Sequence, residues 1–198
     1  MSPDLFIALA TFAFVSSITP GPNNLMLMAS GANFGLQRTI PHMLGISLGH
    51  GFMVFLIGLG LAELFERFPL VRTILFGVCT IYLLYLAWKI ANAAAPGEGS
   101  ADGRPFTFLQ AAAFQWVNPK AIYMAITAQT YYAPPGEGAI GAVAVAVIFS
   151  LINLPSVGVW AWAGTKIRLI LSTKRRLLIF NWTMALLLVF SLWPLLTG

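Results

Sequence analysis

The chain is 198 residues long, and 59% of its residues are apolar whereas only 9% are charged. A soluble domain carries roughly 25% charged residues, so this composition excludes a water-soluble globular protein and indicates a protein whose surface faces lipid. The net charge of +5 comes from basic residues between apolar runs rather than from an amphipathic face. That placement argues against a nucleic-acid partner.

Six apolar segments are long enough to cross a bilayer, which takes about 20 helical residues. The run from Leu5 has no basic residue before it, so it is interpreted as a first span and not as a signal peptide. We predict an all-α integral membrane protein with six transmembrane helices in one domain, residues 1–198. Residues 1–90 form the first three-helix half, 91–104 a cytoplasmic linker and 105–198 the second half. The predicted spans are Leu5 to about Ala32, Pro41 to about Leu64, Val71–Ile90, Phe106 to about Tyr131, Ala139–Gly164 and Leu177–Leu196.

The basic residues predict the orientation of these spans. With the N-terminus outside, eight Lys and Arg residues fall in inner loops, two fall in outer loops, and Lys120 lies within the fourth span. Because cytoplasmic loops carry an excess of Lys and Arg, both termini are expected on the periplasmic side. The inner residues are Arg38, Lys89, Arg104, Lys166, Arg168, Lys174, Arg175 and Arg176.

The third and sixth spans are the most uniformly apolar. We expect them to face lipid or a second copy of the chain in a homodimer. The other four spans carry the Gly, Pro, Asn and Ser residues, so we expect them to form the interior.

An internal repeat is indicated by two prolines. Placing Pro20 over Pro119 aligns Ala10–Pro20 with Leu109–Pro119, and each proline lies well inside the first span of a three-helix half. Because three spans are an odd number, the halves run through the membrane in opposite senses, as in the inverted repeats of many secondary transporters. The alternative is two ordinary proline kinks.

The first span is predicted to break at Pro20, Gly21 and Pro22. Two prolines remove amide donors from the helix ladder, and Asn23 and Asn24 follow at once as candidate caps of a second half-helix. Freed backbone groups at membrane depth are tolerated only in a protein interior or a wet cavity. We therefore expect a functional break, with a structural kink as the alternative.

The fourth span carries Gln115, Asn118, Pro119 and Lys120. Lys120 is about 14 residues, or about 20 Å, from the start of its predicted helix, and a cation inside the membrane is costly enough to suggest a function. The alternatives are that it snorkels along a tilted helix or pairs with carbonyls freed by the first break.

The second span contains Gly45, Gly49 and His50, and the fifth contains Asn153 near Pro155. The two glycines, four residues apart, predict a close helix contact. His50 titrates near neutrality in water and is a candidate for proton coupling. The alternative is a structural histidine that is hydrogen-bonded within this glycine-rich contact.

The sequence also argues against other classes of site. The acidic residues lie at span ends or in loops, and no HExxH, Walker or serine–histidine–acid motif occurs, so we expect neither an enzyme nor a cofactor. Cys79 is the single cysteine, which excludes an intrachain disulfide and a CxxC metal site. A channel or metal-ion exporter is the main alternative to a carrier, although cysteine and carboxylate ligands are missing.

Three motifs together resemble the lysine-exporter (LysE/RhtB) family of amino-acid exporters over the whole chain. They are Ile18–Asn24, the glycines of the second span, and Asn118-Pro119-Lys120. The resemblance implies a bacterial inner-membrane exporter of amino acids that is driven by protons. The family's motif residues correspond to Pro20, Gly21, Pro22, Asn23, Asn118, Pro119 and Lys120.

A zwitterionic substrate suggests how the binding residues are used. Lys120 and the half-helix start near Asn23 are expected to bind the carboxylate. Carbonyls released before Pro20 and Pro119, with Asn118, are expected to bind the ammonium group. The second span lacks the early carboxylate associated with the branch for basic amino acids, so a small neutral substrate is expected. The predicted binding residues are Asn23, Asn24, Gln115, Asn118, Lys120 and Asn153.

Overall fold

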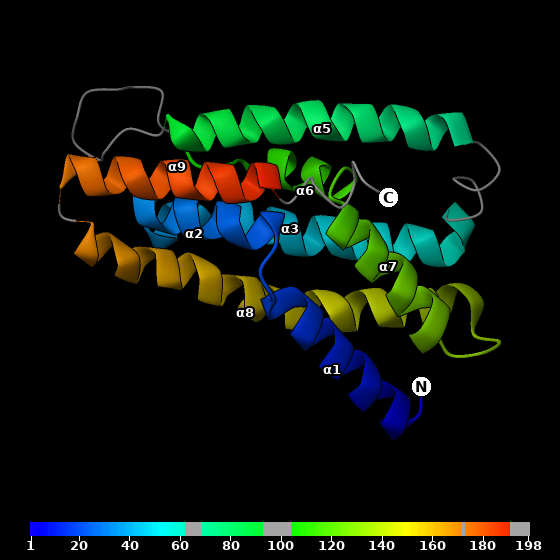
Figure 1. Cartoon of the computed structure of the whole chain (residues 1–198). Helices are drawn as coiled ribbons and strands as arrows, with labels where there is room; N and C mark the ends of the chain where they lie inside the picture. Colours follow the sequence, from blue (N-terminus) through cyan, green and yellow to red (C-terminus); the bar gives the residue numbers. More distant parts are fainter. Residues whose placement is uncertain (62–68, 93–103, 172, 191–198) are drawn as a thin grey trace.

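The computed structural model describes residues 1–61, 69–92, 104–171 and 173–190, and these residues form helices joined by short connections. Figure 1 shows them in chain order. The helices are α1 (Pro3–Ile18), α2 (Pro22–Phe34), α3 (Leu36–Leu56), the π-helical turn η1 (Ile57–Leu61), α5 (Pro69–Ala91), α6 (Phe108–Gln115), α7 (Pro119–Tyr132), α8 (Gly138–Ile170) and α9 (Lys174–Phe190).

The predicted break in the first span is confirmed. Helix α1 ends at Ile18, α2 begins at Pro22, and their axes are bent by 56°. Thr19 leaves the helix in an extended conformation, with φ −67° and ψ 146°. This is the conformation that a following proline favours, so the sequence Thr19-Pro20-Gly21-Pro22 ends one helix and starts the next.

The predicted break in the fourth span is also confirmed. Helix α6 ends at Gln115 and α7 begins at Pro119. Asn118, which precedes the proline, is extended, and its side chain accepts a hydrogen bond from the backbone N–H of Lys120. The proline at the first helical position and the Asn118 cap together define the start of α7.

The second span begins earlier than predicted. Helix α3 starts at Leu36, and Pro41 lies inside it. Gly35 alone separates α2 from α3 and has φ 80°, a left-handed conformation that favours glycine. This turn starts α3 before the proline, so that Pro41 lies inside the helix and not at its start. Residues 62–64, the end of the predicted span, lie outside the described residues.

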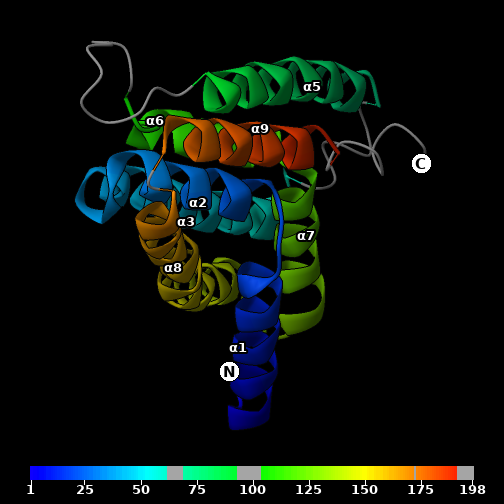
Figure 2. The ribbon, with the colours of Figure 1, turned by 60° about the vertical axis from the view of Figure 1, so that its left-hand side comes forward.

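The helices form a layered bundle in which α8 lies against α1, α2 and α3, while α3 packs on α6. Helix α5 forms the outermost layer and packs on α9, as both views show (Figures 1 and 2). The expected peripheral position of the third span therefore agrees with the structure. Helix α1, expected in the interior, buries only Leu9, Ala13 and Ser17, because it projects diagonally from the bundle beside α7.

Two continuous helices of the described part of the chain are long and apolar enough to cross a membrane. They are Leu36–Leu61 and Gly138–Ile170, and the bent pair of α1 and α2 makes a third candidate span. The order of elements repeats along the chain, because each half has a broken helix followed by two further helices. The six-span inverted arrangement stays a prediction, and residues 191–196 of the sixth predicted span lie outside the described residues.

Glycines bring the helix backbones into close contact, as the sequence predicts for the second span. A Cβ atom placed on Gly49 would lie 2.5 Å from Ala112 Cα, and one placed on Gly45 would collide with the Phe108 backbone, so α3 lies directly on α6. Gly31 and Gly164 play the same part between α2 and α8. These contacts hold the two broken helices against the two long ones.

The α3–α6 contact predicts that Gly49→Ala destabilises the protein by about 1–3 kcal/mol, because an added methyl group forces two backbones apart. Gly77→Ala is the matched control, since a Cβ atom there meets nothing within 4 Å and alanine favours the helix. Thermal unfolding in detergent measures both. Equal midpoints for the two variants would contradict the contact.

Candidate functional site

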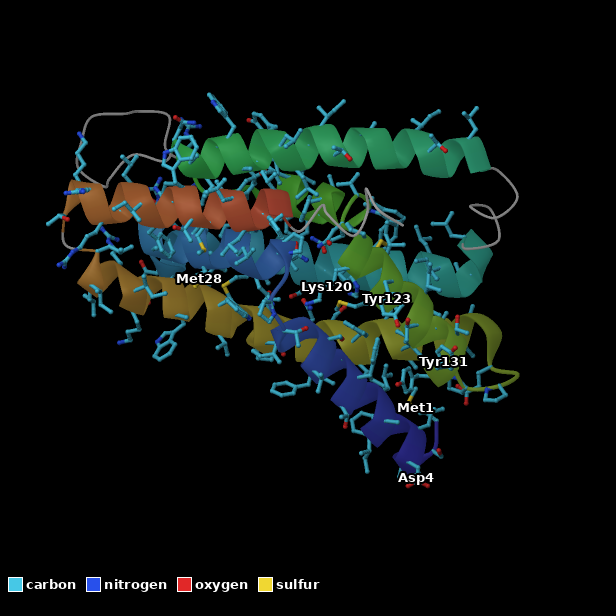
Figure 3. The ribbon with its side chains drawn as sticks, viewed as in Figure 1. Met1, Asp4, Met28, Lys120, Tyr123 and Tyr131 are labelled. Atoms are coloured by element: carbon cyan, nitrogen blue, oxygen red, sulfur yellow. The ribbon has the colours of Figure 1, made fainter. Side chains whose placement is uncertain are left out.

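A pocket lies where the two helix breaks meet the middles of α3 and α8. In this conformation its cavity volume is about 20 Å³, room for about one water molecule. Figure 3 shows Lys120 at the start of α7, beside the connection between α1 and α2. Gly21 also lines the pocket. Six predicted site residues line it together: Asn23, Asn24, His50, Asn118, Lys120 and Asn153.

The carbonyl groups freed at the end of α1 are bound by side chains from three other helices, α2, α8 and α7. Asn24 of α2 donates to Ser17 O at 2.8 Å and to Thr19 O at 2.7 Å. Trp160 of α8 donates its indole N–H to Ile18 O at 2.9 Å. An unpaired carbonyl is costly inside a membrane protein, so these donors stabilise the broken conformation.

Lys120 binds the same break from α7. Its ammonium group donates to Thr19 O at 2.7 Å, to Thr19 Oγ1 at 2.9 Å and to Pro20 O at 3.2 Å. A Cβ atom on Gly21 would lie 2.8 Å from Lys120 Cδ, so the glycine leaves room for the lysine side chain. Lys120 has no ion pair with any residue that the structure describes. Within the described part of the chain, neutral oxygens are therefore the partners of this charge.

A reciprocal amide pair joins the two breaks. Asn23 Nδ2 donates to Gln115 Oε1 at 2.8 Å, and Gln115 Nε2 donates to Asn23 Oδ1 at 3.2 Å. Gln115 also donates to Ala111 O within its own helix. Gln115 thus supports the pocket through Asn23 and is not itself among the lining residues.

A polar chain crosses the pocket wall from α3 to α1. Ser47 donates to Asn153 Oδ1 at 2.8 Å, and Asn153 Nδ2 donates to Ser17 Oγ at 2.9 Å. All three residues are buried. Both the oxygen and the nitrogen of the Asn153 amide are therefore hydrogen-bonded, and this residue of α8 links α3 to α1.

His50 lies in the pocket wall and is 1% exposed. Its Nε2 is 3.1 Å from Ala121 O, in the first turn of α7, and its ring packs on Phe149 with 4.8 Å between centroids. Because a carbonyl oxygen only accepts, Nε2 carries the hydrogen. Nδ1 is then a bare acceptor, and it is buried without a hydrogen-bond partner among the described residues.

A model of the family described as LysE type translocator matches residues 14–195. The chain belongs to the LysE type translocator family. The predicted resemblance is therefore confirmed, and the protein is a membrane transporter and not an enzyme.

Several curated proteins are similar to this translocator over most of its length. A cysteine/O-acetylserine efflux protein of Klebsiella pneumoniae is 33% identical over 195 residues, or 96% of each chain. An Escherichia coli protein of the same name is 31% identical over 192 residues, again 96% of each. One from Salmonella typhimurium is 33% identical over 166 residues, 83% of this chain and 84% of that one. No solved structure matches.

The geometry corrects one expectation about this translocator. Asn23 and Asn24 do not cap α2, because its cap is Gly21 and makes no side-chain hydrogen bond. Asn24 instead turns back to α1, and Asn23 turns to α6. The carbonyls before Pro20 already accept hydrogen bonds from Asn24, Trp160 and Lys120, and their binding of a substrate ammonium group stays a prediction.

Sequence reasoning missed Trp160, Ser17, Ser47 and Thr19. Trp160 lies in an apolar run that is typical of any membrane helix, so nothing local marked it as a partner of the break. The signal for Ser17 was stronger, because it lies just before the predicted end of the first half-helix.

The bonds from Asn24 predict that Asn24→Leu destabilises the translocator by about 1–3 kcal/mol, since it leaves Ser17 O without its donor. Asn92→Leu is the control, because Asn92 makes the same kind of bond, to Trp88 O, at an exposed helix end. Midpoints of thermal unfolding in detergent give the comparison. A smaller loss for Asn24→Leu than for Asn92→Leu would contradict the assigned role.

Proposed function

We propose that this translocator exports small neutral amino acids across the bacterial inner membrane, driven by the proton motive force. The support comes from its family, from the names of its relatives, which describe efflux of cysteine and O-acetylserine, and from the chemistry of the pocket. In this proposal the two halves are inverted repeats and both termini face the periplasm.

The observation that carries the proposal is the pairing of Lys120. Its ammonium group is bound only by Thr19 and Pro20 oxygens among the described residues. A carboxylate forms a stronger, charge-assisted bond to an ammonium group than a neutral carbonyl does. An arriving amino-acid carboxylate therefore competes with the break for the same cation.

Because of this competition, substrate binding changes the contacts between the two halves of the chain. Lys120 belongs to α7, whereas the oxygens that it binds belong to the connection between α1 and α2. When a carboxylate replaces them, the first break loses one of its ties to the second half. A ligand shifts a conformational equilibrium only by its differential affinity for the two states, and this exchange supplies such a difference.

The absence of acidic residues from the pocket lining supports a neutral substrate. A lysine or arginine substrate would bring a second positive side chain close to Lys120. An unpaired charge in a desolvated site is expensive, so cationic amino acids should be rejected. Cysteine and O-acetylserine each carry one carboxylate, one ammonium group and an uncharged side chain, so neither brings a second positive charge to this pocket.

Counterflow in proteoliposomes tests the function. Vesicles loaded with unlabelled L-cysteine or O-acetyl-L-serine should transiently accumulate the external labelled compound above equilibrium, because a carrier exchanges substrate and a channel does not. L-lysine and L-arginine should show no overshoot. Simple equilibration of every compound would indicate a channel. Overshoot for the cationic amino acids alone would reject the proposed substrate class.

The Lys120 contacts predict that Lys120→Met abolishes counterflow while the protein stays folded. Loss of a charge-assisted bond, worth about 1.5–3 kcal/mol, should weaken substrate binding roughly ten- to a hundredfold. Lys120→Arg should restore only part of the activity, because a planar guanidinium has a different shape. Lys166→Met is the control, since Lys166 is exposed and lies over Trp162. Normal counterflow by Lys120→Met would remove Lys120 from the site.

A further inference from the structure

The pocket has a group for the substrate carboxylate, but most of its acceptors are already in use. Asn23 Oδ1 accepts from Gln115, and Asn118 Oδ1 accepts from the backbone of Lys120. Asn153 Oδ1 accepts from Ser47. Ser17 O and Ile18 O of the first break accept from Asn24 and Trp160. A zwitterion nevertheless brings an ammonium group with three donors, which loses its hydration on entering the pocket.

His50 Nδ1 is the acceptor in the pocket wall that is both buried from solvent and unpaired among the described residues. Asn24 Oδ1 also receives no hydrogen bond from them, but it is not fully buried from solvent as His50 Nδ1 is. A buried acceptor without a partner carries a desolvation penalty that a donor from a ligand removes. His50 Nδ1 therefore gains more from an arriving donor than acceptors that already have one.

The position of His50 relative to Lys120 is fixed by one backbone bond. Its Nε2–H donates to Ala121 O, the residue that follows Lys120 in α7. The same bond selects the tautomer that leaves a lone pair on Nδ1. His50 of α3 and Lys120 of α7 thus line one pocket.

We propose that His50 Nδ1 accepts a hydrogen bond from the α-ammonium group of the exported amino acid. Lys120 binds the carboxylate of the same molecule. The inference rests on the proposed function and deepens it, because it makes the α-amino group, and not only the carboxylate, a requirement for binding. His50 is then a specificity-determining residue of the substrate site. The role differs from proton coupling, in which the same lone pair would bind a proton.

Nitrogen NMR of histidine-labelled full-length protein in detergent tests this directly, because His42 and His50 are the two histidines of the chain. L-cysteine should shift the Nδ1 resonance of His50 and leave that of His42 in place, with His42→Gln providing the assignment. Mercaptopropionate, which keeps the carboxylate and the thiol but lacks the ammonium group, should not shift it. Equal shifts with both compounds, or none with bound L-cysteine, would overturn the inference.

Binding affinities give a second measurement. The unmodified protein should bind L-cysteine about ten- to a hundredfold more tightly than mercaptopropionate. His50→Gln keeps an amide at the Nε2 position and lacks an acceptor at Nδ1, so this preference should collapse. His50→Asn places an amide oxygen at the Nδ1 position and should keep part of it. His42→Gln is the control and should keep all of it, because His42 packs on Phe106 and is not among the lining residues.

The outcomes separate the two proposals. If the unmodified protein binds neither compound and shows no counterflow, the proposed function fails, and this inference fails with it. If counterflow of L-cysteine is normal but the preference for it is absent, or is unchanged in His50→Gln, only the inference fails. A His50→Gln protein with an unchanged preference but no response to a proton gradient would make His50 a proton carrier instead.

Discussion

The structure depends on how the protein satisfies the backbone carbonyls at the end of α1. Two prolines remove the amide donors that would continue the helix, and a lipid environment offers no replacement. The donors come from three other helices: Asn24 from α2, Trp160 from α8 and Lys120 from α7. Each donor holds its own helix against the break. The need of these carbonyls for hydrogen-bond donors therefore positions most of the pocket.

This constraint also explains why the two breaks lie together. Lys120 and Asn118 belong to the start of α7, and Asn118 caps the helix on which Lys120 is placed. The amide pair of Asn23 and Gln115 ties the start of α2 to the end of α6. The close glycine contact of α3 with α6 keeps the second break against the long helix that carries His50. A change in the conformation of either break therefore alters hydrogen bonds made by the other.

The parts of this arrangement that follow from local chemistry could be predicted from the sequence. A proline lacks an amide hydrogen wherever it lies, so the breaks at Pro20 and Pro119 were predictable. The pairing of Lys120 with carbonyls of the first break, one of the alternatives for this residue, was predictable for the same reason. The tertiary contacts of the side chains could not be predicted from the sequence. Whether Asn24 caps its own helix or reaches back to Ser17 O depends on the bend at the break. The start of α3 before Pro41 was likewise not predicted, because the left-handed turn at Gly35 had no distinctive local signal in the sequence.

The carbonyl bonds of Lys120 have a further consequence for transport. A cation without partners would bind a carboxylate tightly and release it slowly, which limits turnover in a carrier. Here the substrate must displace three contacts to Thr19 and Pro20, so the net gain is the difference between two sets of bonds. The same oxygens rebind Lys120 when the substrate leaves, which favours release and returns the first break to its tied conformation.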